Sequence, residues 1–182
     1  MAVMSIVTYT ENKAALRQKS KPVKHIDGRV KRLIRDLKDT INNHPDAIGL
    51  AAPQINFHSR VVVVRLGGNR DNDAEPDPPI ALINPRITEA GDEKPDFDGC
   101  LSFPGLYAET VRPHRLKVAF TDEDGNRFHK AFEGFDAVVV HHEIDHLDGK
   151  LFIDHLESID SLYRIQMDEQ GKWACARLGI NY

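Results

Sequence analysis

The sequence predicts a single domain of the α+β class, and three observations support this prediction. Its 182 residues, 41% of them hydrophobic, are enough for one domain with a buried core. No internal repeat or long low-complexity tract divides the chain. Segments with strand composition and segments with helical periodicity are grouped rather than strictly alternating, which favours α+β over α/β. We therefore expect residues 1–182 to form one domain, with residues 158–182 as a C-terminal tail that the pattern defines poorly.

The composition argues against several classes of protein. Lys and Arg number 24 and Asp and Glu 28, for a net charge of −4, which argues against binding to DNA or to an anionic membrane. No apolar run approaches the roughly 18 residues needed to span a bilayer, and the first residues lack the pattern of a signal peptide. Two cysteines cannot form a disulfide framework and suit a reducing compartment. We expect a cytoplasmic protein without a DNA or membrane partner.

The first predicted helix covers residues 27–43, with Asp27 as its N-cap. Its apolar residues recur at helical spacing, while charged residues fill the other face. A glycine-bearing loop is expected at residues 47–54, followed by a buried strand of four valines at residues 61–64. Residues 67–79 are polar and rich in Gly, Pro and Asp, so we expect an exposed loop there.

The middle of the chain carries strand patterns. Residues 80–90 are predicted to form one strand. A hairpin follows, with strands at residues 116–121 and 127–132, because Asp124 and Gly125 between them are a hairpin turn signal.

A second helix is predicted over residues 135–147, with Gly149 just after its end as the C′ residue. Three consecutive valines at residues 138–140 favour a strand by a few tenths of a kcal/mol each, so burial must override this preference. The tail begins with apolar residues at helical spacing, which predict a short helix before an irregular end: Ile159, Leu162 and Ile165.

An HExxH pattern lies at residues 142–146 within this second helix. Its histidines, His142 and His146, are four residues apart, about 6 Å along the helix axis and on one face. Both imidazoles can therefore reach one metal ion, with Glu143 beside them to act on a bound water. The motif ends an apolar stretch, where unpaired polar groups would be costly. A chance occurrence on a polar helix is therefore the weaker interpretation.

Two histidines do not complete a metal site, because a catalytic metal usually has three protein ligands and one open position. Downstream, His155 and Glu157 have no recognisable third-ligand motif around them. Upstream, Cys100 follows Gly99, and a thiolate is a good ligand for a soft or borderline metal. A lone cysteine is more often a small buried hydrophobe, so Cys100 is a candidate only together with the histidines.

At this point the residues resemble a known family, the peptide deformylases. Three segments in this order look like its signature motifs: GLAAPQ at 49–54, GCLS at 99–102 and HEIDHLDG at 142–149. Flanking segments extend the resemblance over about residues 20–156: KPV at 21–23, FPGLYAE at 103–109 and LFIDHL at 151–156. One motif alone would be weak, whereas three in order are highly specific.

The resemblance implies antiparallel sheets packed around the helix that carries the histidines. It also implies a metal site formed by Cys100, His142 and His146, with Glu143 as general base and later as general acid. Fe²⁺ is the ion that the family implies, with Ni²⁺ and Co²⁺ accepted and Zn²⁺ poorer. The implied reaction is removal of the N-formyl group from the initiator methionine of nascent polypeptides, with release of formate.

The family pattern also assigns roles around the metal site. The Leu101 backbone N–H and the Gln54 side-chain amide would stabilise charge that develops on the formyl oxygen. Without the motif, Gln54 would be interpreted as a loop residue that caps a turn. Gly49 would let the loop backbone approach the substrate. An apolar pocket for methionine would be lined by residues that, taken singly, are more often ordinary core: Ile48, Leu50, Phe135, Val138 and Val139.

Three positions depart from the common form of the family. Ala47 replaces a glycine, which is a mild change if its φ is negative. His141 replaces a glutamine and lies about 100° around the helix from the first histidine, so it is not expected to be a fourth ligand. Asp98 replaces a glutamate, and we expect this shorter carboxylate to pair with Arg112. Asp145 either orients a histidine, pairs with an arginine or faces solvent.

Other functions remain as alternatives. A deformylase-like hydrolase for another acyl peptide, or a relative with reduced activity, would use the same residues, so only assays separate them. A non-catalytic module with a structural metal would need four protein ligands. A zinc endopeptidase would leave the motifs at residues 49–54 and 99–102 unexplained.

The expected partners are N-formylmethionyl nascent peptides and, through a basic patch, the ribosome surface. Two groups of residues would supply such a patch, although groups of this kind are usually just a solvated face. They are Lys19, Lys21 and Lys24, or Arg29, Lys31 and Arg32.

Overall fold

The computed structural model describes residues 2–67, 77–156, 158–167 and 173–177. In this part of the chain the strands form one antiparallel sheet in the order β1-β2-β3-β4-β6-β7, with β5 paired to β4. The strands are β1 (Gly49–Ala51), β2 (Val61–Val64), β3 (Ile80–Gly99), β4 (Leu106–Thr121), β5 (Arg127–Glu133), β6 (Leu162–Met167) and β7 (Trp173–Arg177). The α-helices are α1 (Tyr9–Arg17), α2 (Gly28–Asn42) and α3 (Gly134–Leu147). Short 3₁₀ helices cover Ala52–Ile55, Phe152–His155 and Ile159–Ser161.

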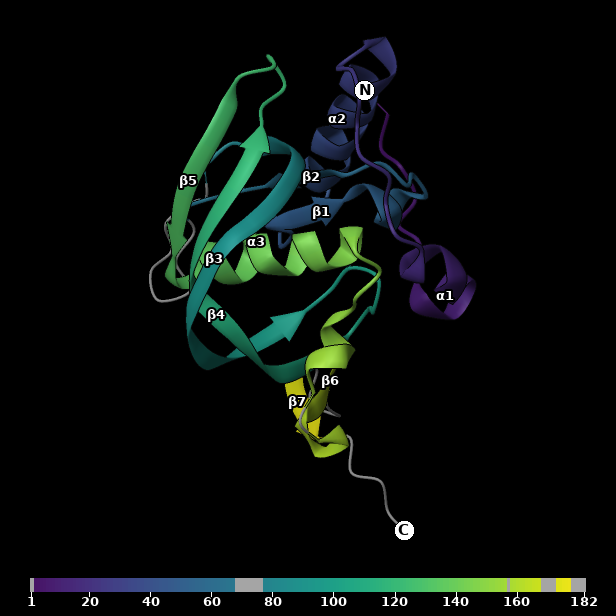
Figure 1. The fold of residues 1–182 in the computed structure, drawn as a ribbon. Coiled ribbons are helices and arrows are strands. Elements are labelled where there is room, and N and C mark those ends of the chain that lie inside the picture. Colours follow the sequence, from purple (N-terminus) through teal and green to yellow (C-terminus); the bar gives the residue numbers. More distant parts are fainter. Residues whose placement is uncertain (1, 68–76, 157, 168–172, 178–182) are drawn as a thin grey trace.

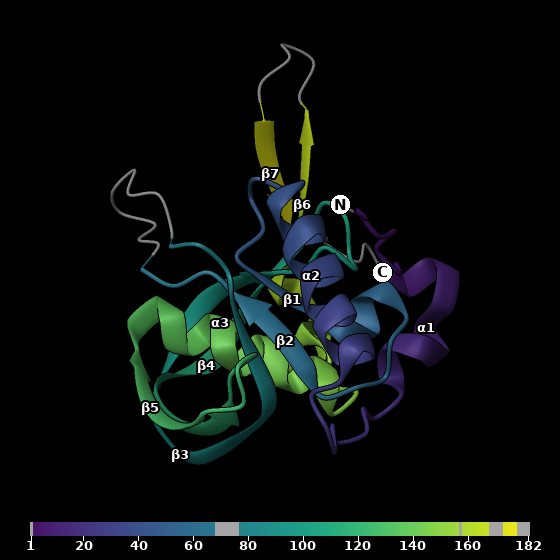
Figure 2. The ribbon, with the colours of Figure 1, turned by 90° about the horizontal axis from the view of Figure 1, so that it is seen from above.

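Helix α3 lies inside the curl of the sheet (Figure 1), and the view from above shows it in the interior of the fold (Figure 2). Ten of its 14 residues are buried. Side chains from β1 through β5 join it in one core cluster, which confirms the predicted α+β arrangement around this helix. Burying a valine contributes roughly 1.5–3 kcal/mol, several times its loss of helix propensity. This burial explains why three consecutive valines are helical here.

Strand β2 is buried on both faces, which explains its uninterrupted run of valines. Val62 and Val64 pack in the cluster around α3, whereas Val61 and Val63 pack in a second cluster with α2. A strand covered on both sides has no polar face and therefore shows no alternation in its sequence. The predicted buried strand at residues 61–64 is confirmed.

Helix α2 covers the face of β2 that points away from α3. Its N-cap is Asp27, whose side chain accepts hydrogen bonds from the backbone N–H groups of Arg29 (2.9 Å) and Val30 (3.1 Å). The apolar face that the sequence predicted is buried in the second cluster: Leu33, Ile34, Leu37 and Ile41. The predicted helix and its cap are confirmed.

The sheet is dominated by β3 and β4, which pair along most of their lengths. Strand β3 continues to Gly99, well beyond the predicted end at residue 90, although residues 91–97 are mostly exposed and polar. Register shifts between Ile83 and Arg86, and again between Ile87 and Glu89, mark irregular pairing along it. Strand β4 likewise begins ten residues before the predicted residue 116. Both extensions are held by backbone hydrogen bonds between the two strands rather than by burial of apolar side chains. The hydrophobicity pattern of the sequence therefore did not indicate them.

Two further boundaries differ from expectation. The expected loop at residues 47–54 contains β1 and the start of a 3₁₀ helix, because Gly49–Ala51 pairs with β2. The predicted hairpin of β4 and β5 and the predicted helix α3 are confirmed. Gly149 has a φ of 72°, as expected of a C′ residue. Most of the expected exposed loop, residues 68–76, lies outside the described residues.

The prediction of a short helix in the tail is wrong. Among the described residues of the tail, only Ile159–Ser161 is helical, as a 3₁₀ turn, and Leu162–Met167 is strand β6. Backbone pairing outweighs the helical spacing here: Ala108 on β4 pairs with Leu162, and β7 pairs with β6 on its other edge. The β6–β7 hairpin projects from the body of the molecule (Figure 2).

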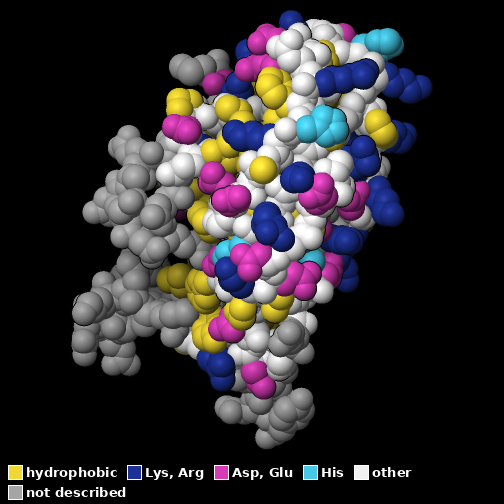
Figure 3. Space-filling model, turned by 60° about the vertical axis from the view of Figure 1, so that its left-hand side comes forward, with side chains coloured by type: hydrophobic (Ala, Val, Ile, Leu, Met, Phe, Trp, Pro, Cys, Tyr) yellow, Lys and Arg dark blue, Asp and Glu magenta, His cyan; other side chains and the backbone are white. Residues whose placement is uncertain are grey.

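Charged side chains of both signs are interspersed over the side of the molecule that carries β5 (Figure 3). No helix among the described residues is long and apolar enough to cross a membrane.

Candidate metal centre and active site

Three side chains that are far apart in the sequence meet beside α3. Cys100 follows the end of β3, and His142 and His146 lie one helical turn apart on α3. Their ligand atoms all lie within 4.8 Å of one another, and Cys100 Sγ lies 3.3 Å from His146 Nε2. One thiolate and two imidazoles suit a borderline transition metal ion such as Fe²⁺, Co²⁺, Ni²⁺ or Zn²⁺. The donor set therefore fits a metal ion, and in the described part of the chain this group offers three ligands.

The two histidines differ in how their outer ring nitrogens are held. His142 Nδ1 lies 2.8 Å from Asp98 Oδ1, which leaves its Nε2 for the cluster. Among the described residues, His146 Nδ1 is buried without a hydrogen-bond partner. A carboxylate on the outer nitrogen fixes the tautomer and orientation of a ligating histidine. The chain thus orients His142 through a side chain and His146 through packing.

Asp98 is held by a buried arginine on β4. Arg112 is fully buried. Its Nη2 and Nε donate hydrogen bonds to Asp98 Oδ2, at 2.8 Å and 3.0 Å respectively. Burial opposes ionisation, but His142 and Arg112 outweigh it and hold the pKa of Asp98 well below its usual value. The shorter carboxylate therefore reaches both the histidine and the arginine, so the expected ion pair is present.

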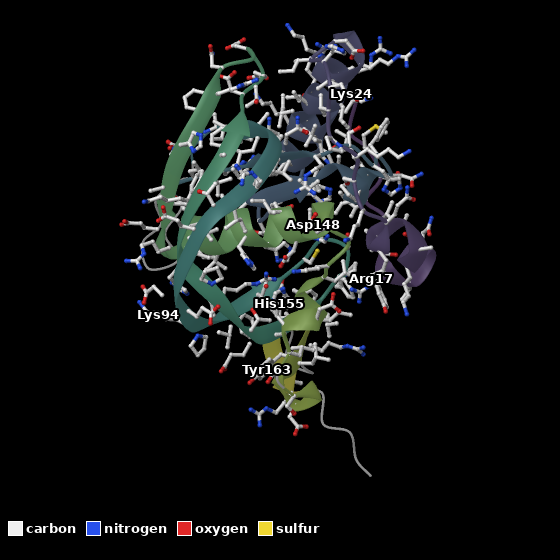
Figure 4. The ribbon with its side chains drawn as sticks, in the orientation of Figure 1. Arg17, Lys24, Lys94, Asp148, His155 and Tyr163 are labelled. Atoms are coloured by element: carbon white, nitrogen blue, oxygen red, sulfur yellow. The ribbon has the colours of Figure 1, made fainter. Side chains whose placement is uncertain are left out.

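Arg112 also holds a second carboxylate, that of Asp145 on α3. Its Nη1 lies 2.5 Å from Asp145 Oδ2 and 2.7 Å from His141 Nδ1. His155 Nε2 lies 2.7 Å from the same oxygen of Asp145. Asp145 is therefore buried and paired rather than facing solvent. Figure 4 shows His155 between α3 and the β6–β7 hairpin, and nothing in the sequence pattern had linked it to this network.

Glu143 differs from these acids because its carboxylate is buried with one oxygen unpaired. Only 4% of the residue is exposed, and Oε2 has no hydrogen-bond partner among the described residues. Burial raises the pKa of Glu143 to about 7. A proton acceptor poised near neutral pH is what general base catalysis requires.

Gly49 on β1 makes room for that carboxylate. A Cβ atom at this position would lie 2.3 Å from Glu143 Oε1, closer than any real contact. Glu143 therefore requires glycine here, and the expected approach of this backbone to substrate stays a prediction. Ala47, two residues earlier, is absent from the residues with positive φ, so its replacement of glycine costs no backbone strain.

Gln54 joins the first motif to the second. Its Oε1 accepts a 2.8 Å hydrogen bond from the Ala51 backbone N–H, as a turn-capping glutamine would. Its Nε2 donates toward Cys100 Sγ (3.5 Å) and Ser102 Oγ (3.4 Å). The side chain is only 1% exposed, so the amide is held beside the cluster. Capping and positioning are therefore two functions of one side chain.

A cavity of about 760 Å³ opens next to these groups. Cys100, Gln54, His142 and Glu143 contribute to its wall, as does Leu101. The structure also places along it residues expected for the methionine pocket: Ile48, Gly49, Phe135, Val138 and Val139. Leu50 is not among the lining residues; it is fully buried in the cluster under α2 because it follows Gly49 on the opposite face of β1.

Three aromatic residues of the cavity wall were missed by sequence reasoning: Phe97, Phe103 and Tyr107. Phe97 lies three residues before Cys100, and Tyr107 lies in the segment after it. Tyr107 packs on Gly99, where a Cβ atom would lie 2.6 Å from its ring. The glycine beside Cys100 was the available signal, because a glycine in a strand often marks a close approach.

A thiolate and two imidazoles beside a buried carboxylate, at an apolar cavity, define a metal-dependent hydrolase. The comparisons with known proteins identify which one. A family model for polypeptide deformylase matches residues 3–161. The peptide deformylase of Teredinibacter turnerae is 40% identical over 160 residues, covering 87% of this chain and 90% of that protein. That of Saccharophagus degradans is 38% identical over 181 residues, covering 98% of this chain and 100% of that protein.

The solved structures agree. The crystal structure of a peptide deformylase from Legionella pneumophila superimposes with a TM-score of 0.76 at 35% identity, covering 87% of this chain and 88% of that one. The chain belongs to the polypeptide deformylase family. It is a hydrolase that removes the N-formyl group from nascent peptides.

Proposed function

We propose that the described residues act as one catalytic domain in which Cys100, His142 and His146 hold a single Fe²⁺ ion. The thiolate and the imidazoles support this assignment, because they are ligands that a borderline metal prefers. Ni²⁺, Co²⁺ and Zn²⁺ fit the same donors. When bound, the ion would lower the pKa of a water molecule and polarise the formyl carbonyl.

Glu143 acts as the general base and then as the general acid. It accepts a proton from the attacking water and later delivers it to the departing amine. The observation that carries this role is its buried carboxylate, unpaired at Oε2 within the described residues and packed on Gly49 at the cavity. A carboxylate without a partner has no structural use for its charge, and its burial costs stability.

Gln54 and Leu101 stabilise the charge that develops on the formyl oxygen. Gln54, whose Nε2 lies beside Cys100 Sγ, and Leu101 both line the cavity. Removal of one such donor typically costs roughly 3 kcal/mol of transition-state stabilisation. The methionine side chain lies against the apolar wall formed by Ile48, Phe135, Val138 and Val139, and Gly49 borders the same wall.

Formate release from a formyl-methionyl tripeptide tests these roles. The protein is purified without oxygen, loaded with Fe²⁺ and compared with Glu143→Ala. We expect rapid release that is lost in the variant while bound metal is retained. Cys100→Ser tests the metal ligands in the same way. We expect elemental analysis to find less bound metal in this variant. No formate from a folded, iron-loaded sample would contradict the assignment and favour another acyl-peptide substrate or reduced activity.

We further propose that the enzyme works in the cytoplasm at the ribosome surface, through basic residues of α2 and the segment before it. Arg29, Lys31 and Arg32 are exposed, and none of them forms an ion pair with another described residue. Lys19, Lys21 and Lys24 are exposed as well. Salt-dependent attraction to ribosomal RNA follows from such unpaired cations.

Cosedimentation with ribosomes tests this contact. The variant Arg29→Glu/Lys31→Glu/Arg32→Glu should sediment less with ribosomes at low salt, whereas Lys94→Glu should not change. Lys94 is a matched control because it lies far from Lys24 in Figure 4 and is already paired with Asp92. Equal sedimentation of both variants would exclude the basic residues of α2 as the contact.

A further inference from the structure

Three aromatic rings from three different strands contact one another beside the cavity, and two of them line it. Phe97 on β3 stacks on Tyr107 of β4, with ring centroids 5.5 Å apart and planes 7° apart. Tyr163 on β6 contacts Phe97, with ring centroids 5.6 Å apart and planes 53° apart. We call these three residues the aromatic platform. Phe97 is 37% exposed, which makes it one of the exposed large hydrophobic residues of the protein.

The aromatic platform is continuous with the cavity that contains the candidate metal centre. Phe97 and Tyr107 line that cavity together with Cys100, Glu143 and the methionine wall. The Tyr107 ring lies over Gly99, the residue before Cys100. Through its contact with Phe97, Tyr163 therefore extends the cavity wall away from Cys100 and Glu143.

Tyr163 comes from a part of the chain that the family model does not cover. The match ends at residue 161, and β6 begins at Leu162. Main-chain pairing holds the ring in place, because Tyr163 is opposite Tyr107 in the register of β6 and β4. The Ile165 N–H also donates to the Gly105 carbonyl at 3.0 Å. Figure 4 shows Tyr163 at the base of the hairpin, where it joins the body of the protein.

A further contact keeps the Tyr163 ring fixed. The guanidinium of Arg177 on β7 lies 5.7 Å from the ring centroid, and its Nη2 donates to the Tyr163 hydroxyl at 3.4 Å. A ring clamped in this way loses little freedom when a ligand packs on it. Tyr163 is only partly buried, so part of this fixed side chain remains available for binding.

We propose that the aromatic platform binds the residues of the nascent polypeptide that follow the formylmethionine, and that it favours aromatic side chains among them. This inference rests on the proposed function. The occupant follows from continuity, because a polypeptide whose first residue fills the methionine wall must leave along the cavity rim. Aromatic side chains fit because offset and edge-on contacts between rings contribute beyond their buried area.

A set of formyl-methionyl hexapeptides tests the proposal. One peptide has serine at positions two to five, and four others carry a single tyrosine at one of these positions. In the wild-type enzyme we expect at least one tyrosine peptide to have a kcat/KM roughly three- to tenfold above that of the serine peptide. The gain should appear in KM rather than in kcat, because the contact is made equally in the ground state and the transition state.

Variants of the aromatic platform identify its contribution. Tyr163→Ala and Phe97→Leu should each reduce the ratio of kcat/KM between the tyrosine and serine peptides toward one, whereas Tyr163→Phe should preserve the ratio. Phe128→Ala is the matched control, because Phe128 is 42% exposed on β5, stacks on Phe120 and does not line the cavity. This control should keep the wild-type ratio.

Three outcomes would overturn the proposal. One is a wild-type enzyme that hydrolyses all five hexapeptides equally, which needs no variant to observe. Another is a ratio that Tyr163→Ala leaves unchanged. The third is a wild-type dimer that Tyr163→Ala converts to a monomer in sedimentation velocity, because a second copy would then cover these rings. Failure of the proposed function is distinguishable, because the serine hexapeptide would then release no formate.

Discussion

The two faces of α3 each carry a buried acid, and the protein treats these acids in opposite ways. Asp145 is held by Arg112 and His155, and although burial opposes ionisation, these partners and His141 keep its pKa below the usual value. Glu143 has one oxygen without a partner in the described structure, and burial raises its pKa to about 7. Both residues are at most 6% exposed, so burial alone does not distinguish them.

The difference distinguishes a residue that holds the structure in place from a residue that takes part in the reaction. A buried charge that is fully paired keeps its position and its protonation state, which suits a group that holds others in place. A buried charge without a full set of partners costs stability, and it persists where function requires a group that exchanges protons. The face of α3 with Asp145 therefore anchors the helix to β4, and the face with Glu143 meets the cavity.

The largest effect is expected for Glu143→Gln, which keeps the shape of the side chain and removes the base. We expect kcat/KM for formate release to fall about 10²- to 10⁴-fold. The free energy of unfolding in urea should stay the same or rise, because a neutral amide replaces an unpaired carboxylate. An activity within threefold of the wild type would show that another group takes the proton.

Asp145→Asn is the matched change on the other face, and its main effect should be on stability. It leaves Arg112 and His155 beside a neutral amide, and breaking a buried ion pair costs about 3–5 kcal/mol. Urea unfolding measures this loss. A loss below about 1 kcal/mol would mean that Asp98 alone satisfies Arg112, and the contrast between the two faces would then be weaker than the geometry indicates.

Gly49→Ala tests whether the position of Glu143 matters as much as its charge. The added Cβ would displace a carboxylate oxygen that lies 2.3 Å away, and we expect kcat to fall roughly a hundredfold with the fold intact. Gly28→Ala is the matched control, because no atom lies within 4 Å of a Cβ at that position. Equal activity of both variants would show that Glu143 tolerates the shift.

Asp98→Glu should have the smallest effect, although it restores the residue that the family commonly has. The aspartate already contacts His142 at 2.8 Å and Arg112 at 2.8 Å. One more methylene in this buried network should cost about 1–3 kcal/mol of stability and reduce activity by less than tenfold. A hundredfold gain in formate release would instead show that the natural site is impaired.

Some elements of the fold could be predicted from the sequence and others could not. The amphipathic α2, the four valines of β2 and the Asp124–Gly125 hairpin were predictable, because periodicity, apolar runs and turn residues are local signals. The second half of β3 and the β6–β7 hairpin were not. Their residues are held by pairing with β4, a contact between segments that no local pattern records.

The candidate site shows the same division. The spacing of His142 and His146, the glutamate between them and the GCLS and GLAAPQ segments are enough to indicate the family and the metal-binding group. The sequence also suggested that Asp98 pairs with Arg112. It left Asp145 open between solvent and an ion pair, and it did not connect His155 or Tyr163 to the site.

The sequence by itself indicated the chemistry, because the helical spacing of the two histidines and the resemblance of three motifs to one family suggest which donors can reach one ion. Only the tertiary structure decided the environment of each group. Whether a carboxylate is paired with Arg112 or packed against Gly49 depends on strands that arrive from distant parts of the chain. Burial and pairing set a carboxylate's proton affinity, and these are properties of the packed fold rather than of the local sequence.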